Sequence, residues 1–474
     1  MKVLIVTIYF DVEILYSINF KFCNDMKRII EKKLAEWKIK KNRKPIIIQG
    51  ARQVGKTYSI QKFAKENFRS VHYFDLEALK ADLAPLFNES SLKPEYLIKQ
   101  LSFFSGHSIE LQHDVLILDE IQAIPRALVA LKYFHQEIPE LAICVAGSNL
   151  GIAMAKEPFP VGKVEIIEMF PLSFLEFLQG TDEFLATELI EGFSGGVTSD
   201  LEHKRLFELL KTYLVVGGLP GVITAYLEFK DHPIKAFEQA RKEQQQLLMQ
   251  YSRDFSKYSG SVNARHIERV FQAIPSQLSV MQNKKSKKFI FKDVISKGYR
   301  SYESLADPID WLVKANLALK VSLIEIPAIP LPAYTQENAF KLFLFDIGLL
   351  GSIVGLRPID IQRYNYGTYK GFFAENYVLQ ELVSQGYQNI TSWSGRMAEI
   401  EFVFDVDGQI VPVEVKAGIN TRAKSLQAYI QKYTPAFSVK ITGNKFGYDS
   451  TRKIFNLPLY LTSKFSDLSE NHHT

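Results

Sequence analysis

The sequence predicts an α/β protein built from about three domains. Its 474 residues far exceed the roughly 150 residues of a typical domain, so the chain can bury several cores. In the first 180 residues, short apolar runs rich in β-branched side chains are followed by segments with helical periodicity. Near residue 400, alternating apolar and polar residues predict strands of a second sheet. Together these patterns indicate an α/β fold in more than one unit.

The composition is that of an ordinary globular protein. Hydrophobic residues make up 47% and charged residues 23% of the chain, which excludes a disordered, collagen-like or coiled-coil protein. The net charge of +5 is too small to indicate nucleic-acid binding by itself. Cys23 and Cys144 are the two cysteines, so a disulfide scaffold and a multi-cysteine zinc cluster are excluded, and we expect a cytoplasmic protein.

The N-terminal segment begins with a short apolar run. The apolar run from Val3 to Phe10 resembles a short signal sequence, but Asp11 and Glu13 follow at once and there is no suitable cleavage site. We interpret residues 1–25 as a leader of doubtful status, with Met26 as an alternative start. No window of 18 uninterrupted apolar residues occurs, so we expect no membrane span.

A glycine-rich motif lies between a predicted strand at 45–49 and a predicted helix that follows it. Its residues are Gly50, Ala51, Arg52, Gln53, Val54, Gly55, Lys56 and Thr57. They match the P-loop pattern G-x-x-x-x-G-K-[ST], in which backbone N–H groups cradle phosphate oxygens. The lysine neutralises the β- and γ-phosphates, the threonine hydroxyl binds Mg²⁺, and the helix N-terminus adds a positive dipole. The motif therefore predicts binding of ATP with Mg²⁺.

Two further strand ends supply polar residues for the same site. The apolar run 115–118 ends in Asp119 and Glu120, for which we predict roles in holding Mg²⁺ and orienting the attacking water. The run 141–146 ends near Ser148, which is our first choice for a residue that senses the γ-phosphate, and Asn149 is the alternative. The structural interpretation is an ordinary turn that contains glycine and serine.

Two arginines are weaker candidates for the site. Arg126 fits either a finger acting on a neighbouring subunit or a surface arginine, and we favour the surface. Arg253 fits either a nucleotide contact or a helix-capping or salt-bridged role, and we favour the latter.

Several segments together resemble the prokaryotic AAA+ ATPases that carry a C-terminal domain of unknown function. The matching segments are Asp119-Glu120-Ile121-Gln122, Leu131-Lys132-Tyr133-Phe134, Gly147-Ser148, Phe159-Pro160-Val161-Gly162, Phe170-Pro171-Leu172-Ser173-Phe174-Leu175-Glu176-Phe177 and Gly217-Gly218-Leu219-Pro220. The resemblance extends over nearly the whole chain. It implies an AAA-like P-loop core at 26–180, a helical region at 181–262, a winged-helix-like region at 263–330 and a restriction-endonuclease-like α/β domain at 331–474.

Two basic stretches are candidates for DNA contact. Residues 26–44 predict a basic amphipathic helix, which we interpret mainly as a solvated face with one apolar stripe. In the winged-helix-like region, a helix predicted to end at Pro275 precedes a lysine-rich run at 284–300 and a strand at 321–326. Such a run either contacts DNA or is solvated surface, and the sequence leaves both open.

The C-terminal region contains a candidate nuclease-like site. A hairpin centred between Val406 and Asp407 would place Glu401 opposite Pro412 and on the same face as Glu414 and Lys416. With Glu375 on a preceding helix, these residues resemble the PD-(D/E)xK arrangement, which binds Mg²⁺ and cleaves phosphodiesters. Glu401 stands where that family usually has Asp, and a salt-bridged Glu/Lys pair on a sheet face is the structural interpretation.

We therefore expect an ATPase with ATP and Mg²⁺ as cofactors, whose turnover is coupled to a nuclease-like domain acting on nucleic acid. DNA and further copies of the chain are candidate partners. The alternative is a nucleotide-dependent switch whose C-terminal domain is catalytically inactive and binds protein or DNA.

Overall fold

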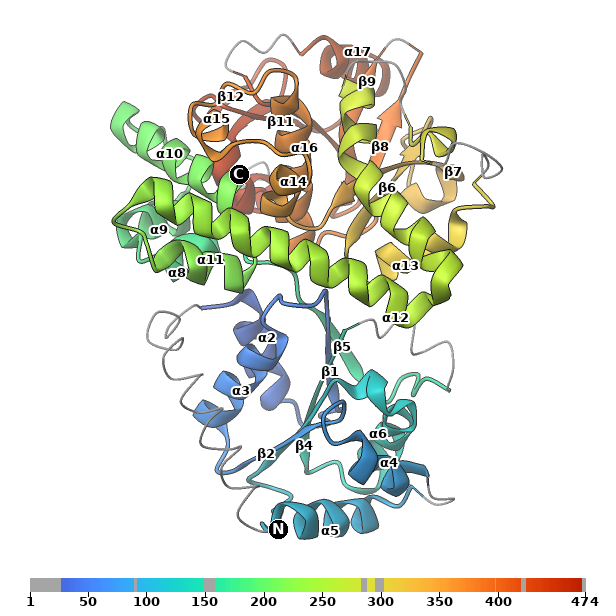
Figure 1. Cartoon of the computed structure of the whole chain (residues 1–474). Helices are drawn as coiled ribbons and strands as arrows, with labels where there is room; N and C mark the ends of the chain where they lie inside the picture. The colour runs from blue at the N-terminus through green and yellow to red at the C-terminus, as the bar shows by residue number, and fades with distance from the viewer. Residues whose placement is uncertain are drawn as a thin grey trace.

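The computed structural model describes residues 27–88, 92–148, 158–282, 288–294, 302–396, 398–418 and 423–470. They form two bodies, a lower one containing the first part of the chain and an upper one containing the rest (Figure 1). The predictions for residues 1–26, for Asn149 and for most of the basic run at 284–300 lie outside the described residues.

The lower body is built on a five-stranded parallel sheet in the order β2-β3-β4-β1-β5. Its strands are β1 (Ile46–Gln49), β2 (Val71–Asp75), β3 (Val115–Asp119), β4 (Ala142–Gly147) and β5 (Glu165–Glu168). Its helices are α2 (Ile29–Lys38), α3 (Lys56–Asn67), α4 (Lys80–Asn88), α5 (Pro94–Ser105) and α6 (Pro125–Glu137). β3 and β4 are buried along their whole length, as strands covered by helices on both faces are expected to be.

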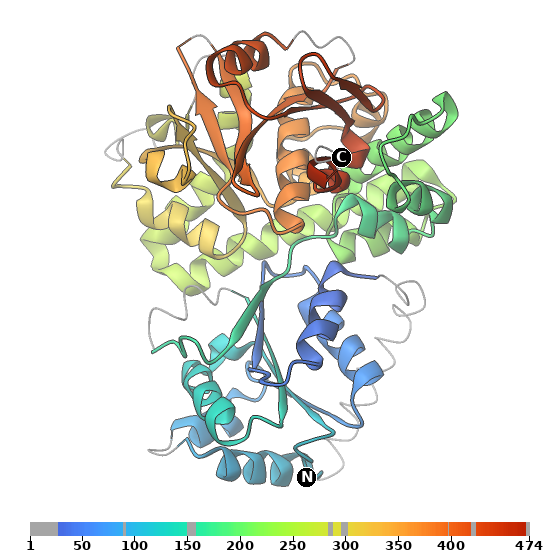
Figure 2. The same cartoon turned by 180° about the vertical axis from the view of Figure 1, so that it is seen from behind.

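Alternation along β1 assigns the helices to the two faces of this sheet. Ile46 and Ile48 belong to the core that includes α2 and α3, whereas Ile47 belongs to the core that includes α4, α5 and α6. The apolar stripe predicted for the basic helix is formed by Ile30, Leu34 and Trp37, which are buried in α2. Because all five strands are parallel, their carboxyl ends lie at the same edge of the sheet, which faces the upper body (Figures 1 and 2).

Helices separate this sheet from the rest of the upper body. They are α8 (Phe174–Gly180), α9 (Phe184–Glu191), α10 (Asp200–Val216), α11 (Pro220–Leu227) and α12 (Pro233–Gln282). Residues 181–262 are largely helical. Between α10 and α11, a Cβ at Gly218 would lie 2.2 Å from the Leu172 carbonyl oxygen, so only glycine allows this close approach to the segment between β5 and α8.

The prediction that a helix ends at Pro275 is wrong. α12 is a single helix of 50 residues that contains Pro275 and crosses the predicted domain boundary at 262/263. Its buried stripe continues on both sides of the proline, through Phe271, Ile274 and Leu278. The packing of this stripe outweighs the hydrogen bond that proline removes from a helix.

The described part of 263–330 does not form a separate winged-helix unit, which corrects that prediction. Its other elements are α13 (Ala306–Lys314) and β6 (Ala318–Ile324). β6 pairs with β7 (Thr335–Leu344) and with β8 (Thr391–Ser394), so the predicted boundary at 330 separates neighbouring strands of one sheet.

That sheet has eight strands in the order β12-β13-β11-β10-β9-β8-β6-β7. The remaining strands are β9 (Glu399–Val406), β10 (Gln409–Lys416), β11 (Ser438–Thr442), β12 (Gly447–Asp449) and β13 (Ile454–Pro458). The remaining helices are α14 (Ile347–Ile353), α15 (Pro358–Gln362), α16 (Tyr369–Ser384), α17 (Lys424–Tyr433) and α18 (Asp467–Glu470). α16 and α17 pack on β10, and α17 also packs on β9.

The hairpin between β9 and β10 forms, but its predicted register was wrong by two residues. Val403, not Glu401, lies opposite Pro412. Asp407 and Gly408 both have positive φ, at 50° and 79°, and form the two-residue turn typical of tight hairpins. A shift of two residues leaves every side chain on the same face of the sheet, so the predicted grouping of Glu401 with Glu414 and Lys416 still holds.

Among the described residues, no single helix is long and apolar enough to cross a membrane. One bent pair, Asp200–Val216 with Pro220–Leu227 at 116°, meets the requirement by length and composition.

Candidate functional site: a nucleotide pocket between two bodies

The P-loop motif lies where predicted, between β1 and α3. Gln53 and Gly55 have positive φ values of 64° and 95°, which turn the backbone so that the loop leads into the N-terminus of α3. At Gly50, an added Cβ would lie 2.2 Å from the Met169 carbonyl oxygen. The loop thus requires its first glycine for space and its second for backbone conformation.

Lys56 at the start of α3 is turned toward its own loop. Its Nζ donates to the carbonyl oxygens of Gly50 at 3.0 Å and Ala51 at 2.8 Å. Burial lowers the pKa of Lys56 to about 8, although the carboxylates of Glu120 and Asp119 oppose this shift. An anion in the loop would stabilise the charged ammonium and raise this pKa.

Asp119 at the end of β3 forms a set of oxygen contacts with neighbouring elements. The Thr57 hydroxyl donates to Asp119 Oδ2 at 2.6 Å, and the Tyr73 hydroxyl donates to the same oxygen at 2.9 Å. The backbone N–H of Glu120 donates to Asp119 Oδ1 at 2.9 Å. A hydroxyl and a carboxylate side by side are the oxygen ligands that Mg²⁺ prefers, so Thr57 and Asp119 fit this ion.

Glu120 and Ser148 meet across the ends of β3 and β4. Ser148 Oγ donates to Glu120 Oε2 at 3.3 Å, and Gln122 Nε2 also donates to that oxygen. Glu120 has a φ of 48°, a left-handed conformation that costs a non-glycine residue about 1–3 kcal/mol and often occurs at functional sites. This conformation directs its side chain toward β4, the strand between β3 and β1.

Lys56, Thr57, Asp119 and Glu120 line a cavity of about 510 Å³, within the size range of small-molecule sites, roughly 300–1,000 Å³. The predicted sensor Ser148 is buried behind Glu120, outside this lining as far as the structure describes it. The lining residues of the cavity are Arg28, Arg52, Gln53, Gly55, Lys56, Thr57, Tyr58, Gln61, Tyr73, Asp75, Asp119, Glu120, Pro220, Gln250, Tyr251 and Asp254. The last four come from α11 and α12, so the upper body closes one side of the pocket.

Sequence reasoning missed several of these residues. Tyr251 and Asp254 lie about 200 positions after the P-loop, and no motif marks them. Tyr73 lies on β2, which precedes β3 in the chain and pairs with it. This order of strands was the one weak indication that Tyr73 lies near Asp119. Arg28 was included in the basic helix as a surface residue, yet it is buried.

The two candidate arginines lie outside the lining of this cavity as far as the structure describes it. Arg126 Nε donates to the Phe87 carbonyl oxygen at 2.9 Å. Arg253 is exposed on α12.

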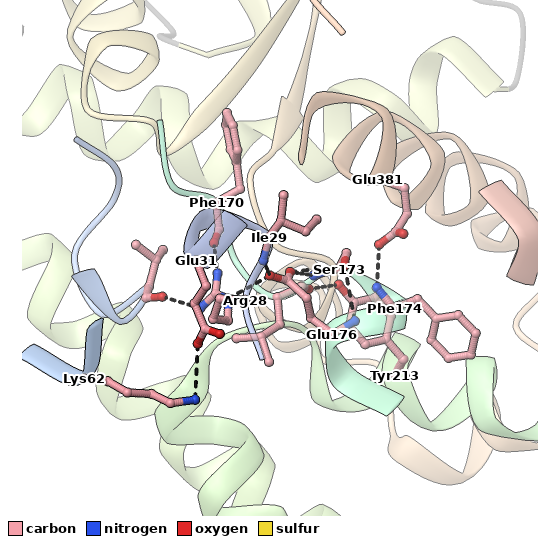
Figure 3. Close-up of polar contacts among 12 residues, drawn as sticks. Arg28, Ile29, Glu31, Lys62, Phe170, Ser173, Phe174, Glu176, Tyr213 and Glu381 are labelled. Atoms are coloured by element: carbon pink, nitrogen blue, oxygen red, sulfur yellow. Dashed lines mark hydrogen bonds and ion pairs between the residues drawn. The ribbon is translucent and has the colours of Figure 1, made fainter. Parts of the chain in front are cut away.

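A buried polar cluster connects the P-loop with the upper body (Figure 3). Arg28 Nη1 donates to the Val54 carbonyl oxygen at 3.0 Å, and its Nε pairs with Glu176 Oε1 at 2.9 Å. Glu176 also caps α8 through Ser173, whose backbone N–H donates to Glu176 Oε2 at 2.8 Å. The next N–H, that of Phe174, donates to Glu381 Oε1 of α16 at 2.8 Å. Direct contacts therefore lead from the P-loop through α8 to α16.

Glu381 predicts a pH dependence of stability. Burial raises its pKa from 4.5 to about 8, and its Oε2 has no hydrogen-bond partner among the described residues. The pKa of Glu381 is higher in the folded than in the unfolded protein. Its contribution to stability is therefore fully present below pH 4.5 and is lost as the pH rises toward 8. Between these values Glu381 lowers the free energy of unfolding by up to about 1.4 kcal/mol per pH unit.

We expect Glu381→Gln, which keeps the acceptor for the Phe174 N–H, to flatten this dependence. Thermal unfolding at pH 5 and pH 8.5 measures it, with the exposed Glu188→Gln as control. Equal slopes for Glu381→Gln and the wild type would contradict the prediction.

The four residues of the predicted nuclease-like site lie near one another in the upper body. Lys416 Nζ lies 3.0 Å from Glu401 Oε1 and 3.1 Å from Glu414 Oε1. Burial raises the pKa of Glu375 to about 7, with the Glu401 charge adding to the shift. A second buried lysine, Lys341 of β7, pairs with Glu399.

Carboxylates of this cluster are ion-paired with lysines. Within the part of the chain that the structure describes, no group of three or more His, Cys, Asp or Glu side chains is arranged to hold a metal ion. Lys416 bridges Glu401 and Glu414, and Lys341 supplies a second positive charge inside the cluster. The Mg²⁺ site at Glu375, Glu401, Glu414 and Lys416 stays a prediction.

Residues 42–178 match a sequence family described as an AAA domain. This match covers the P-loop, the strand ending in Asp119 and the strand before Ser148. The lower body is an AAA-like P-loop domain. Beyond this AAA-type domain, residues 207–360 and 370–460 match two families described as domains of unknown function, DUF8612 and DUF4143. No curated protein matches the chain significantly.

Three similar solved structures are those of the Walker-type ATPase PABY2304 of Pyrococcus abyssi, the Aeropyrum pernix ORC1 protein in complex with DNA, and Drosophila ORC bound to DNA. The Pyrococcus protein is 14% identical, with a TM-score of 0.45, over 70% of this chain and 96% of its own. The Aeropyrum protein is 12% identical, with a TM-score of 0.23, over 69% and 90%. The Drosophila protein is 16% identical, with a TM-score of 0.24, over 69% and 94%.

Proposed function

We propose that this protein is a Mg²⁺-dependent ATPase that acts as a switch, in which the nucleotide bound to the AAA-type domain controls the upper body. The observation that carries the proposal is the shared pocket: the P-loop, Asp119 and Glu120 form one side, and Tyr251 and Asp254 of α12 form the other. A ligand in this pocket contacts both bodies.

Each residue has a distinct role in this proposal. The backbone of Gly50–Gly55 binds phosphate oxygens, and Lys56 neutralises their charge. Thr57 and Asp119 hold Mg²⁺, which when bound offsets further phosphate charge. Glu120 orients a water molecule for attack on the γ-phosphate and accepts its proton. Ser148, hydrogen-bonded to Glu120, responds to the presence of that phosphate.

Two routes link the pocket to the upper body. α12 lines the pocket and packs against α13, α14, α16 and β7 (Figures 1 and 2). The second route runs from Val54 through Arg28 and Glu176 to Glu381 on α16. α16 also carries Glu375, so both routes converge on the nuclease-like part of the chain.

For that C-terminal part we favour a binding role without catalysis. Glu401 and Glu414 are both ion-paired with Lys416, so lysine charges within the cluster balance the carboxylate charges. DNA is the partner we propose, in a cytoplasmic setting. Lys288 and Lys292 are the described members of the basic run at 284–300. Assembly with further copies of the chain is part of the same proposal.

The second candidate is a metal-dependent nuclease, favoured by the order of elements. α16 is followed by three antiparallel strands, β8 to β10, then by α17 and by β11 parallel to β10. These elements bring together Glu375, Glu401, Glu414 and Lys416, the four residues of the predicted PD-(D/E)xK arrangement.

A cleavage assay decides between the two candidates. We expect labelled single- and double-stranded DNA to remain intact with Mg²⁺ or Mn²⁺, with or without ATP. Cleavage by the wild type that is lost in both Lys416→Ala and Glu414→Ala would establish the nuclease instead. Cleavage that persists in both variants would indicate a contaminating enzyme.

ATP turnover by the purified chain tests the ATPase directly. We expect phosphate release that requires Mg²⁺ and stops when EDTA is added. If the wild type neither binds nor hydrolyses ATP, the proposed function is wrong.

A further inference from the structure

Arg52, the third residue of the P-loop motif, is held by the upper body. Its Nη1 lies 2.6 Å from Asp254 Oδ1 and 2.7 Å from Asp254 Oδ2. Its backbone carbonyl oxygen accepts a hydrogen bond from the Tyr251 hydroxyl at 2.9 Å. Tyr251 and Asp254 lie one turn apart on α12, so a single turn of this helix binds both the side chain and the backbone of the phosphate-binding loop.

The Arg52 guanidinium also reaches the polar groups around the γ-phosphate position. Its Nε lies 3.4 Å from Ser148 Oγ, which is in turn bonded to Glu120. Its Nη2 lies 3.7 Å from Glu77 Oε2 at the other end of the guanidinium. The side chain is 27% exposed and that of Asp254 is 14% exposed, so this ion pair is only partly screened by solvent.

The position of Asp254 makes it a competitor of a bound triphosphate. Both partners of the ion pair line the nucleotide pocket, and an arginine binds phosphate through the same donors with which it binds a carboxylate. The terminal phosphate of ATP brings additional negative charge to this end of the pocket. It would attract the guanidinium of Arg52 and repel the carboxylate of Asp254.

We propose that Arg52 exchanges its partner, pairing with Asp254 when the terminal phosphate is absent and with the γ-phosphate when ATP is bound. This proposal rests on the proposed function. Asp254 then acts as an internal inhibitor of ATP binding, and Arg52 distinguishes ATP from ADP. The exchange frees the Asp254 turn of α12, which transmits the nucleotide state to the upper body.

Binding of ATPγS and of ADP, each with Mg²⁺, tests the exchange by isothermal titration calorimetry on the full chain. For Asp254→Asn we expect ATPγS to bind about tenfold tighter, equivalent to 1.4 kcal/mol, and ADP affinity to change by less than about threefold. Glu238→Gln removes one negative charge from an exposed position of α12 and should change neither affinity.

The reciprocal variant, Arg52→Gln, should weaken ATPγS and remove the preference for ATPγS over ADP. In the double variant, Asp254→Asn should give a much smaller gain than tenfold, because most of its benefit acts through Arg52. If the tenfold gain persists in the double variant, Asp254 acts only by repulsion and the exchange is wrong.

The outcomes also separate this proposal from the proposed function. If the wild type binds nucleotide but Asp254→Asn and Arg52→Gln leave the ATPγS/ADP preference unchanged, the exchange alone is overturned. If the wild type binds neither nucleotide, both are overturned. Thermal unfolding of each variant confirms that it folds.

Discussion

Glu120→Gln should reduce ATP turnover by about 10²- to 10⁴-fold, the range typical of a lost general base. Glutamine keeps the length of the side chain and can still bond to Gln122 and Ser148, but it cannot accept the proton of an attacking water. ATP affinity should remain within about threefold of the wild type, because no phosphate contact is removed. Single-turnover phosphate release, measured alongside equilibrium binding of ATP, separates these two effects.

Glu137→Gln is the matched control for this change, since Glu137 is exposed on α6 and lies outside the described pocket lining. It should turn over ATP at the wild-type rate. A Glu120→Gln variant that hydrolyses ATP as fast as this control would assign the general base to another residue.

Lys56→Met should weaken ATP binding by about 1.5 to 3.5 orders of magnitude, because losing a buried charge partner costs about 2–5 kcal/mol. Methionine fills much of the same space but cannot neutralise the phosphates. It also loses the bonds to the Gly50 and Ala51 carbonyl groups, so unfolding must be measured in parallel. The exposed Lys65 on α3 provides the control, Lys65→Met, which should bind ATP normally.

The lowered pKa of Lys56 gives this prediction a second readout. The free protein loses the ammonium charge as the pH rises through about 8, so wild-type ATP affinity should fall above that pH. Lys56→Met has no such group and should show a flatter profile between pH 7 and 9. A wild-type affinity that stays constant over this range would contradict the role given to the ammonium.

The sequence was most informative where chemistry depends on local order. The Gly50–Thr57 motif follows directly from residue types at fixed spacing, since the loop needs glycines at its turns and a lysine at the helix start. Parallel strands bring their carboxyl ends to one edge, which is why Asp119 and Ser148 could be expected near the loop. The fold of the lower body was predictable for the same reason.

The upper body was harder to predict, because its organisation depends on contacts between distant segments. Pro275 indicates a helix end by local preference, yet the apolar stripe around it is buried on both sides and the helix continues. Likewise, nothing local reveals that β6 joins the sheet of β8 and β9. The pairing of Arg52 with Asp254 spans 202 positions, and a single sequence carries no signal for it.

The C-terminal cluster lies between these cases. Period-two alternation placed Glu401, Glu414 and Lys416 on one face even though the register was wrong by two residues. Alternation could not reveal Lys341, which reaches the cluster from β7, because that strand is distant in the sequence. Lys341 and Lys416 carry the two positive charges that balance the carboxylates of the cluster.

In the proposed switch, α12 transmits the nucleotide state of the AAA-type domain to the upper body. Amide hydrogen exchange along α12, measured in Glu120→Gln without nucleotide, with ADP·Mg²⁺ and with ATP·Mg²⁺, tests it most directly. We expect faster exchange in the turns around Tyr251 and Asp254 with ATP than with ADP, because that segment is released from Arg52. Identical exchange along α12 in all three states, in a protein shown to bind ATP, would contradict it.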